Sequence, residues 1–294
     1  MRKNLLRSGI IAISFIGAIS VASCGGSSEV NNDTLVIGME CQYQPFNWTV
    51  TKESEYTLPI DNSNEFVDGY DIQIAKYLSE DLNKPVIIKR IVWDSLIPSL
   101  QNNEINMVLA GMSSTAERRE AIDFTDPYLT SDLAFLIKKE NIPEGNSESN
   151  PATYEELLEL FAGQSLICQR GVVGDDYIDT YFSSADSSIR HNDPLATYPL
   201  AAQDVSLGTS FAMPAELPVC EAMVNIDPDD LGILYVDQSF LKAEDLEGLS
   251  VSIGIKKGNE ELLNELNDSL SRLDDATRGQ LMGEAAQRSA SNAA

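Results

Sequence analysis

Hydroxyl groups, a helix start and an arginine lie close together in the segment 111–128, where they could hold one small carboxylate. Ser114 and Glu117 have the spacing of a capping box, which predicts a helix that begins at Thr115. The free N–H groups of its first turn favour an anion. Arg118 lies one turn into this helix, and its guanidinium can bind both oxygens of a carboxylate. An ordinary capped surface helix would have the same residues, so this segment alone leaves both interpretations open.

Short apolar runs alternate with helical patterns on the amino-terminal side of this segment. The runs predict strands at 35–38, 86–91 and 105–110. We expect one helix to begin at Asp71, which would cap it, and another helix to begin at Asp94. This order is typical of a parallel doubly wound sheet, in which ligands bind at the carboxyl ends of the strands. The sequence therefore predicts an α/β fold with the segment 111–128 at such an end.

The rest of the chain gives less regular patterns. Residues 48–66 are predicted to form a surface loop or hairpin, because they show no sustained period. Residues 181–213 have no reliable period, and the small polar residues 285–294 are expected to be frayed. The remaining patterns predict strands at 133–138 and 165–169, and helices at 154–161 and 260–273.

Four stretches in order resemble the motifs of the family 3 extracellular solute-binding proteins, the receptors that deliver amino acids to ABC importers. They are Tyr43-Gln44-Pro45-Phe46, Asp68-Gly69-Tyr70-Asp71, the segment from Val92 to Leu100, and the segment 111–128. The resemblance is clear from about Leu35 to Lys139, is weak through the middle and returns at 253–259. It implies a two-lobed clamp of the type II periplasmic-binding-protein fold, in which each lobe is a sheet flanked by helices. It also implies a free amino acid and the permease subunits of an ABC transporter as partners, and no cofactor.

The resemblance also implies where the lobes begin and end. Residues 34–131 would form the first part of lobe 1, and residues 132–250 would form lobe 2. Residues 251–294 would return to lobe 1 and form the carboxyl-terminal tail. The second lobe is expected to close over a ligand held by the first.

By the same resemblance, Tyr43 and Trp93 would lie against the side chain of the ligand. Gly111, Ser113 and Arg118 would surround its carboxylate. Core packing is the alternative for the two aromatic residues, whose rings can also bury an apolar stem and offer a face to a cation.

In lobe 2 the family places an aspartate after an apolar strand, where it accepts from the ligand ammonium. The nearest match is the run 222–228, which is one residue out of step, so Asp227 is expected in this role with Asn225 in reserve. The family often has two hydroxyl residues after a glycine in lobe 2, whereas this chain has Val172 and Val173 there. Backbone N–H groups near Val173, or the side chain of Arg170, would therefore hold the carboxylate from lobe 2.

Glu40 stands three residues before Tyr43 and could meet a positive tip on the ligand, or could be solvated. Together with the two aromatic rings, it leads us to expect arginine, lysine or ornithine ahead of leucine or glutamate. A glutamine or cystine site could use the same two rings.

The amino terminus has the features of an export signal. Residues 1–23 carry basic residues followed by a short apolar run, which predicts a lipoprotein signal peptide, and residues 24–33 would form a flexible tether. Val21-Ala22-Ser23-Cys24 resembles a lipobox, in which Cys24 is lipidated. We therefore expect an extracytoplasmic protein that a lipid anchors to the bacterial cell membrane. A secretory signal with an incidental cysteine is the alternative.

The chain has a formal net charge of −26, which disfavours nucleic-acid partners. The cysteines that follow Cys24 show no paired spacing, so we expect free thiols in the core. A disulfide between Cys168 and Cys220 is the alternative. Cys41 could contact the ligand or could pack in the core.

The sequence has few of the residues that catalysis requires. It contains one histidine, His191, which is expected at the surface, and it shows no nucleophile motif, metal-ligand set or phosphate loop. We therefore expect a binding protein and not an enzyme. A cyclohexadienyl dehydratase, which acts on prephenate or arogenate and shares the fold of the family, is the alternative.

Overall fold

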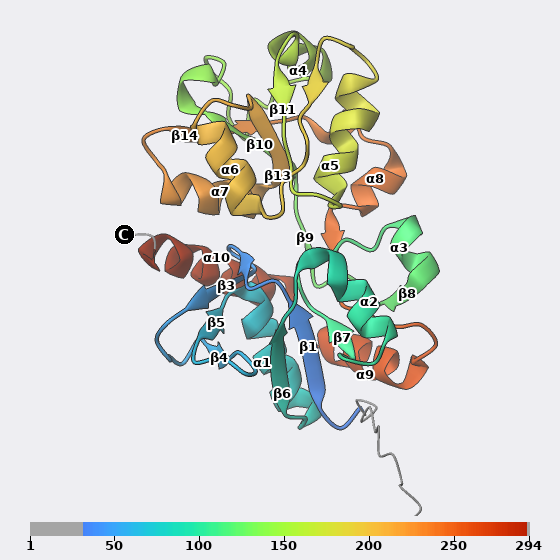
Figure 1. The fold of residues 1–294 in the computed structure, drawn as a ribbon. Helices are drawn as coiled ribbons and strands as arrows, with labels where there is room; N and C mark the ends of the chain where they lie inside the picture. Colours follow the sequence, from blue (N-terminus) through green and yellow to red (C-terminus); the bar gives the residue numbers. More distant parts are fainter. Residues whose placement is uncertain (1–31, 293–294) are drawn as a thin grey trace, which may run out of the picture.

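The computed structural model describes residues 32–292. The predicted signal peptide 1–23, the lipidation site Cys24 and most of the tether 24–33 lie outside the described residues. Two lobes, each built around a sheet, lie one above the other in Figure 1. Within residues 32–292, no helix is long and apolar enough to cross a membrane.

Lobe 1 contains a five-stranded sheet and a smaller four-stranded sheet. The parallel pairing predicted for its first strands is confirmed, because β1 pairs in parallel with β6 and β7. The last two strands of the larger sheet run differently, since β16 is antiparallel to both β7 and β8. The order of the larger sheet is β6 (Val86–Arg90), β1 (Leu35–Met39), β7 (Met107–Val108), β16 (Gly254–Lys256) and β8 (Ile122–Phe124). The smaller sheet has the order β2 (Gln42–Tyr43), β3 (Asn47–Val50), β5 (Phe66–Asp68) and β4 (Leu58–Pro59).

The helices of lobe 1 follow the predicted order, with shifts at their ends. They are α1 (Tyr70–Leu82), the 3₁₀ turn η1 (Trp93–Ser95), α2 (Leu96–Gln101), α3 (Ala116–Ala121) and α9 (Glu260–Leu270). The prediction that Asp71 caps the first helix is wrong. Gly69 is the N-cap of α1, and the buried carboxylate of Asp71 accepts hydrogen bonds from Asn47 and Tyr128.

Lobe 2 contains the second five-stranded sheet. Strand β10 is antiparallel to both of its neighbours, β13 and β14. The strand order is β12 (Arg190–His191), β11 (Ser165–Leu166), β13 (Ala212–Glu216), β10 (Leu133–Lys138) and β14 (Leu231–Tyr235). The surrounding helices are α4 (Tyr154–Phe161), α5 (Val173–Tyr177), the π-helix η3 (Ile178–Ser183), α6 (Tyr198–Ser206), α7 (Leu217–Ile226) and α8 (Ala243–Glu247), with short 3₁₀ turns η2 (Lys139–Asn141) and η4 (Gln238–Phe240).

The chain passes between the lobes in two antiparallel segments. Strand β9 (Leu129–Thr130) leads into lobe 2, and β15 (Ser250–Val251) pairs with it on the way back. Figure 1 shows β9 between the two lobes.

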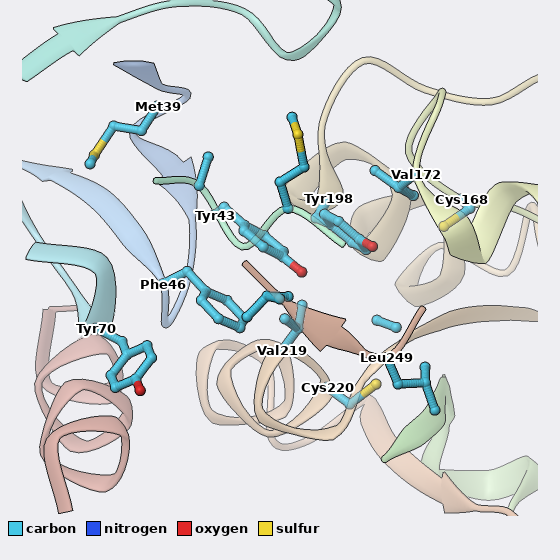
Figure 2. Packing of buried hydrophobic residues seen from close by; sticks show 14 of the residues in the cluster. Met39, Tyr43, Phe46, Tyr70, Cys168, Val172, Tyr198, Val219, Cys220 and Leu249 are labelled. Carbon is cyan, nitrogen blue, oxygen red and sulfur yellow. The ribbon is translucent and has the colours of Figure 1, made fainter. Parts of the chain in front are cut away.

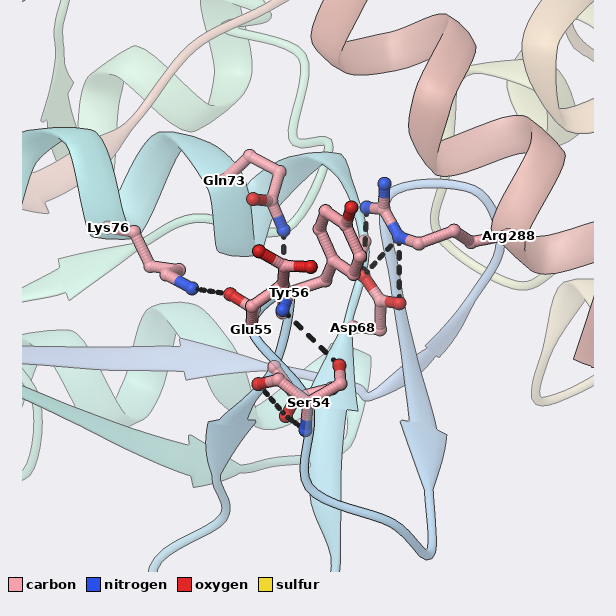
Figure 3. A network of polar contacts seen from close by, with 9 residues as sticks. Ser54, Glu55, Tyr56, Asp68, Gln73, Lys76 and Arg288 are labelled. Atoms are coloured by element: carbon pink, nitrogen blue, oxygen red, sulfur yellow. Dashed lines mark hydrogen bonds and ion pairs between the residues drawn. The ribbon is translucent and has the colours of Figure 1, made fainter.

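The carboxyl terminus forms a long helix, so the prediction that residues 285–294 are frayed is wrong for its described part. Helix α10 (Asp275–Asn292) contacts α1 in lobe 1 and α7 in lobe 2. Ala285 and Ser289 are fully buried, because small side chains allow the helix to lie close against its neighbours. Nε and Nη2 of Arg288 each donate a 2.9 Å hydrogen bond to one carboxylate oxygen of Asp68 (Figure 3). The guanidinium also lies over the ring of Tyr56. These contacts fix the helix to lobe 1.

Candidate functional site

A pocket lies between the lobes, beside the carboxyl ends of β1 and β13. Most of the predicted site residues line it. From lobe 1 come Glu40, Tyr43, Trp93, Gly111, Ser113 and Arg118, and from lobe 2 come Gln169, Val172, Val173, Tyr198 and Glu216. The cavity between these side chains measures about 10 Å³, which is room for about one water molecule. The lobes therefore touch each other through the side chains of the pocket.

Arg118 reaches the pocket from helix α3. The predicted cap at Ser114 is one residue early: Thr115 is the N-cap, and its hydroxyl accepts from the Arg118 backbone N–H. Thr115 has an extended backbone, with φ −64° and ψ 158°, which suits an N-cap. The Ser114 hydroxyl instead accepts from the Arg119 guanidinium. Because the helix starts after Thr115, the Arg118 side chain folds back and donates to the Ser113 carbonyl at 2.9 Å.

The carbonyl of Gly171 joins two site residues across the lobes. It accepts from Nη2 of Arg118 at 2.9 Å and from Nε1 of Trp93 at 3.0 Å. The Arg118 guanidinium also lies 5.2 Å from the centre of the Trp93 ring, within the range of a cation–π contact. Burial lowers the pKa of Arg118. Among the described residues, no carboxylate lies within ion-pair distance of this guanidinium, so the half-buried cation is held by carbonyl groups.

Gly111 is required by the close approach of the pocket aromatics. Its φ of +61° lies in the left-handed region, and a Cβ would lie 2.6 Å from Cε1 of Tyr43. Its N–H donates to the Tyr128 hydroxyl at 3.0 Å, and that hydroxyl donates to Asp71 at 2.7 Å. Burial raises the pKa of Asp71 to about 7. This buried chain of hydrogen bonds fixes the backbone at the floor of the site.

The ring of Tyr43 is covered on both faces, which differs from the expected contact with a ligand side chain. It stacks on Phe46 with centroids 4.9 Å apart and on Tyr198 of lobe 2 at 4.8 Å (Figure 2). Its hydroxyl donates to Oε2 of Glu216 at 2.6 Å. In this arrangement Tyr43 offers the pocket its edge and its hydroxyl, and Tyr198 occupies the face.

Two buried carboxyl groups face the pocket, one from each lobe. Glu216 ends strand β13, and burial raises its pKa, partly offset by the Tyr43 hydroxyl and the Arg118 charge. Glu40 follows β1, and its Oε2 accepts from Nε2 of Gln169 at 3.0 Å. Burial raises the pKa of Glu40 to about 7, against hydrogen bonds from Gln169 and the Trp93 backbone. The pocket thus combines two titratable acids with one guanidinium.

Two predicted residues of lobe 2 lie elsewhere. The expectation for Asp227 is wrong because the run 217–226 is helix α7 and not a strand, which places Asp227 roughly 15 Å along the helix axis from Glu216. Asp227 accepts from the Ser206 hydroxyl on an outer groove, and the reserve residue Asn225 is exposed on α7.

Arg170 also points away from the pocket. Its guanidinium donates to the Pro194 carbonyl at 3.3 Å and lines a neighbouring cleft with Arg90. The expectation that Arg170 holds a carboxylate from lobe 2 is therefore not met by its side chain.

The residues that the sequence analysis missed all come from lobe 2. Glu216 follows the apolar run 212–215, but Pro214 within this run argues against a central strand. Tyr198 opens a helix whose start is signalled by Pro199. Gln169 stands at the end of a predicted strand. The cysteines Cys41, Cys168 and Cys220 are buried and free. Within residues 32–292, no group of three or more His, Cys, Asp or Glu side chains is placed to hold a metal ion.

Comparisons with known proteins place these features in a family. The model of the bacterial extracellular solute-binding proteins, family 3, matches residues 35–282. The L-cystine-binding protein TcyJ of Escherichia coli (strain K12) is 23% identical over 269 residues, which cover 90% of this chain and 88% of TcyJ.

Solved structures show the same fold. The substrate-binding protein AbpA from Streptococcus pneumoniae, bound to L-arginine, has a TM-score of 0.69 at 20% identity, over 87% of this chain and 96% of AbpA. An ancestral arginine-binding protein bound to arginine has a TM-score of 0.64 at 25% identity, over 86% of this chain and 97% of that protein.

Proposed function

The chain belongs to the bacterial extracellular solute-binding proteins of family 3, and we propose that it binds a free amino acid with a cationic side chain and delivers it to an ABC importer. One observation carries this proposal: the pocket places the Arg118 guanidinium together with the carboxyl groups of Glu40 and Glu216. An amino acid such as arginine has one negative and two positive groups. The charges of the pocket are the complement of this set.

Arg118 is the group that would hold the ligand carboxylate. Its side chain is half-buried, and its guanidinium donates only to carbonyl oxygens among the described residues. The guanidinium has five N–H donors, and its two carbonyl contacts use only two of them. A ligand carboxylate could accept charge-assisted hydrogen bonds from other donors while the Gly171 contact persists. Ser113 and Gly111 line the same side of the pocket.

Glu216 takes the role that the sequence analysis gave to Asp227. Its carboxylate lines the pocket and already accepts from the Tyr43 hydroxyl. A carboxylate can accept several hydrogen bonds, so an ammonium can bind while the tyrosine contact persists. Binding of a cation would favour the ionised form of Glu216.

Glu40 would meet the tip of the ligand side chain. It lies on the lobe 1 side of the pocket, and Gln169 donates to only one of its oxygens. The Trp93 ring, Val173 and Tyr198 provide apolar surface for the stem of the ligand. Burial raises the pKa of Glu40 to about 7, and a bound cation would stabilise the charged form of this carboxyl.

Ligand entry would require the lobes to separate. The cavity of about 10 Å³ is far smaller than an amino acid, and hydrogen bonds between the lobes surround it. The paired segments β9 and β15 are the places where backbone rotation could open the clamp. We propose hinge motion there, with lobe 1 covering 34–131 and 251–294 and lobe 2 covering 132–250.

An anchor at Cys24 would keep the receptor at the membrane. The lipobox and the tether predicted from the sequence support lipidation of this residue, with permease subunits of the importer as partners in the same membrane. The site of action would be outside the cytoplasm.

A thermal unfolding assay with a panel of free amino acids tests the proposal. A ligand at 100 times its Kd stabilises the folded state by about 2.7 kcal/mol, so arginine, lysine or ornithine should raise the unfolding temperature. Prephenate and arogenate belong in the panel, because a buried acid such as Glu40 could also protonate a leaving group in a dehydratase. Turnover of either compound without stabilisation by any amino acid would replace the binding function with an enzymatic one.

A further inference from the structure

The single histidine of the chain, His191, is held between two aspartates near the pocket and is not an exposed surface residue. It lies on β12, and 15% of its side chain is exposed. Its Nε2 is 2.9 Å from Oδ1 of Asp175 on α5, and its Nδ1 is 3.1 Å from Oδ1 of Asp179 on η3. The expectation that this histidine lies at the surface is therefore wrong.

Asp175 continues this contact toward the pocket. Its second oxygen, Oδ2, accepts from the Gly171 N–H at 3.2 Å. The Gly171 carbonyl in turn accepts from Trp93 and Arg118, both of which line the pocket. A continuous series of hydrogen bonds thus joins His191, through Asp175 and Gly171, to the two site residues of lobe 1.

We infer that His191 is a positioning residue for ligand binding, acting through Asp175 on the Gly171 loop. An aspartate side chain can rotate and exchange its two oxygens. The bond from His191 Nε2 holds one oxygen, so the other faces the Gly171 N–H. Gly171 has φ +70°, where the backbone is permissive, so an external contact is needed to fix its carbonyl. That carbonyl must stand where Arg118 and Trp93 reach it.

Asp179 contacts the same ring but lies outside this series. Its side chain is 69% exposed, whereas that of Asp175 is 13% exposed. A histidine with its proton on Nε2 donates to Asp175 whether or not Asp179 is present. Replacement of Asp179 is therefore a matched control: it removes one carboxylate from the same histidine without breaking the path to Gly171.

Four variants separate this role from general stability. His191→Phe and Asp175→Ala should break the path, His191→Gln should keep an N–H donor at the position of Nε2, and Asp179→Ala is the control. The readouts are amide hydrogen exchange at Gly171 and the indole N–H resonance of Trp93 by NMR. The Trp48 indole, which is buried and has no hydrogen-bond partner in the structure, reports whether the fold of lobe 1 is intact.

We expect faster exchange at Gly171 and a shifted Trp93 indole in His191→Phe and Asp175→Ala, and parent-like behaviour in the other two variants. The affinity for L-arginine should fall roughly threefold to tenfold in His191→Phe and Asp175→Ala, and less than twofold in His191→Gln and Asp179→Ala. This measurement rests on the proposed function. Unchanged exchange at Gly171 in Asp175→Ala, or equal effects of Asp175→Ala and Asp179→Ala, would overturn the inference. If His191→Phe shifts the Trp48 indole, its fold is altered, and the test then rests on His191→Gln and Asp175→Ala. Faster exchange at Gly171 in Asp175→Ala than in His191→Gln supports the inference, and equal exchange in the two overturns it. Exchange is measured without amino acid, so failure of arginine to bind the parent tells against the proposed function alone.

Discussion

The Tyr43 hydroxyl donates a 2.6 Å hydrogen bond to Glu216, and the two residues belong to different lobes. Gln169 makes a similar contact with Glu40, and the Gly171 carbonyl accepts from two residues of lobe 1. Separation of the lobes breaks all of these bonds. The groups proposed to bind the ligand are therefore the same groups that join the lobes, which couples ligand binding to closure.

Replacement of Arg118 by alanine should weaken amino-acid binding by roughly 2 to 5 kcal/mol, because a desolvated carboxylate would lose its charged partner. Arg170→Ala is the matched control, since that guanidinium lies outside the pocket on the Pro194 carbonyl. Isothermal calorimetry on both variants measures the difference. Equal losses in the two variants would remove Arg118 from its assigned role.

Glu216→Gln should weaken binding of every amino acid by about 1 to 3 kcal/mol, because the charge that meets the ammonium is lost while the shape is kept. Asp227→Asn, at the far end of α7, should leave affinity within about twofold. The same calorimetric titration applies to both. A larger effect of Asp227→Asn would return the ammonium site to the residue that the sequence favoured.

Glu40 should make the binding of cationic amino acids depend on pH. Burial raises its pKa to about 7, and a bound cation favours the ionised form, so binding releases a proton below that pH. Affinity for arginine should rise roughly tenfold from pH 5.5 to pH 8, with no comparable rise for glutamine. In Glu40→Gln the excess slope for arginine should disappear. An identical pH profile for arginine in parent and variant would show that Glu40 does not meet the ligand.

Cys24→Ser should abolish lipid attachment, because the thiol is the acceptor for the lipid. Metabolic labelling with a fatty-acid probe in a bacterial host compares the variant with the parent. Equal label on both proteins would exclude Cys24 as the anchor.

The residues that line the pocket from lobe 1 could be predicted from the sequence because they lie on short segments that resemble the motifs of the family. Gly111, Ser113 and Arg118 come from one stretch, and Glu40 and Tyr43 from another. Each stretch follows a strand whose apolar run is visible locally. The error of one residue at Thr115 reflects two adjacent hydroxyl residues that could both cap a helix.

The residues that line the pocket from lobe 2 could not be predicted in the same way, because packing between residues distant in sequence determines which of them reach the pocket. The run 217–226 is apolar enough for a strand, yet it forms helix α7, with Pro218 in its first turn. Tyr198 reaches the pocket by stacking on Tyr43, which is distant in sequence. The hydrophobic periodicity of the local sequence does not predict such a contact. It does not predict the burial of Ala285 near the end of the chain either.

Competition calorimetry on the parent protein tests the central claim most directly. Arginine, lysine, glutamine, cystine and glutamate are titrated at pH 7.5, where the proposed charges of Glu40 and Arg118 are both available to a ligand. The charge complement of the pocket predicts that arginine or lysine binds more tightly than glutamate by at least tenfold, or about 1.4 kcal/mol. Tighter binding of glutamate than of arginine would contradict the proposal.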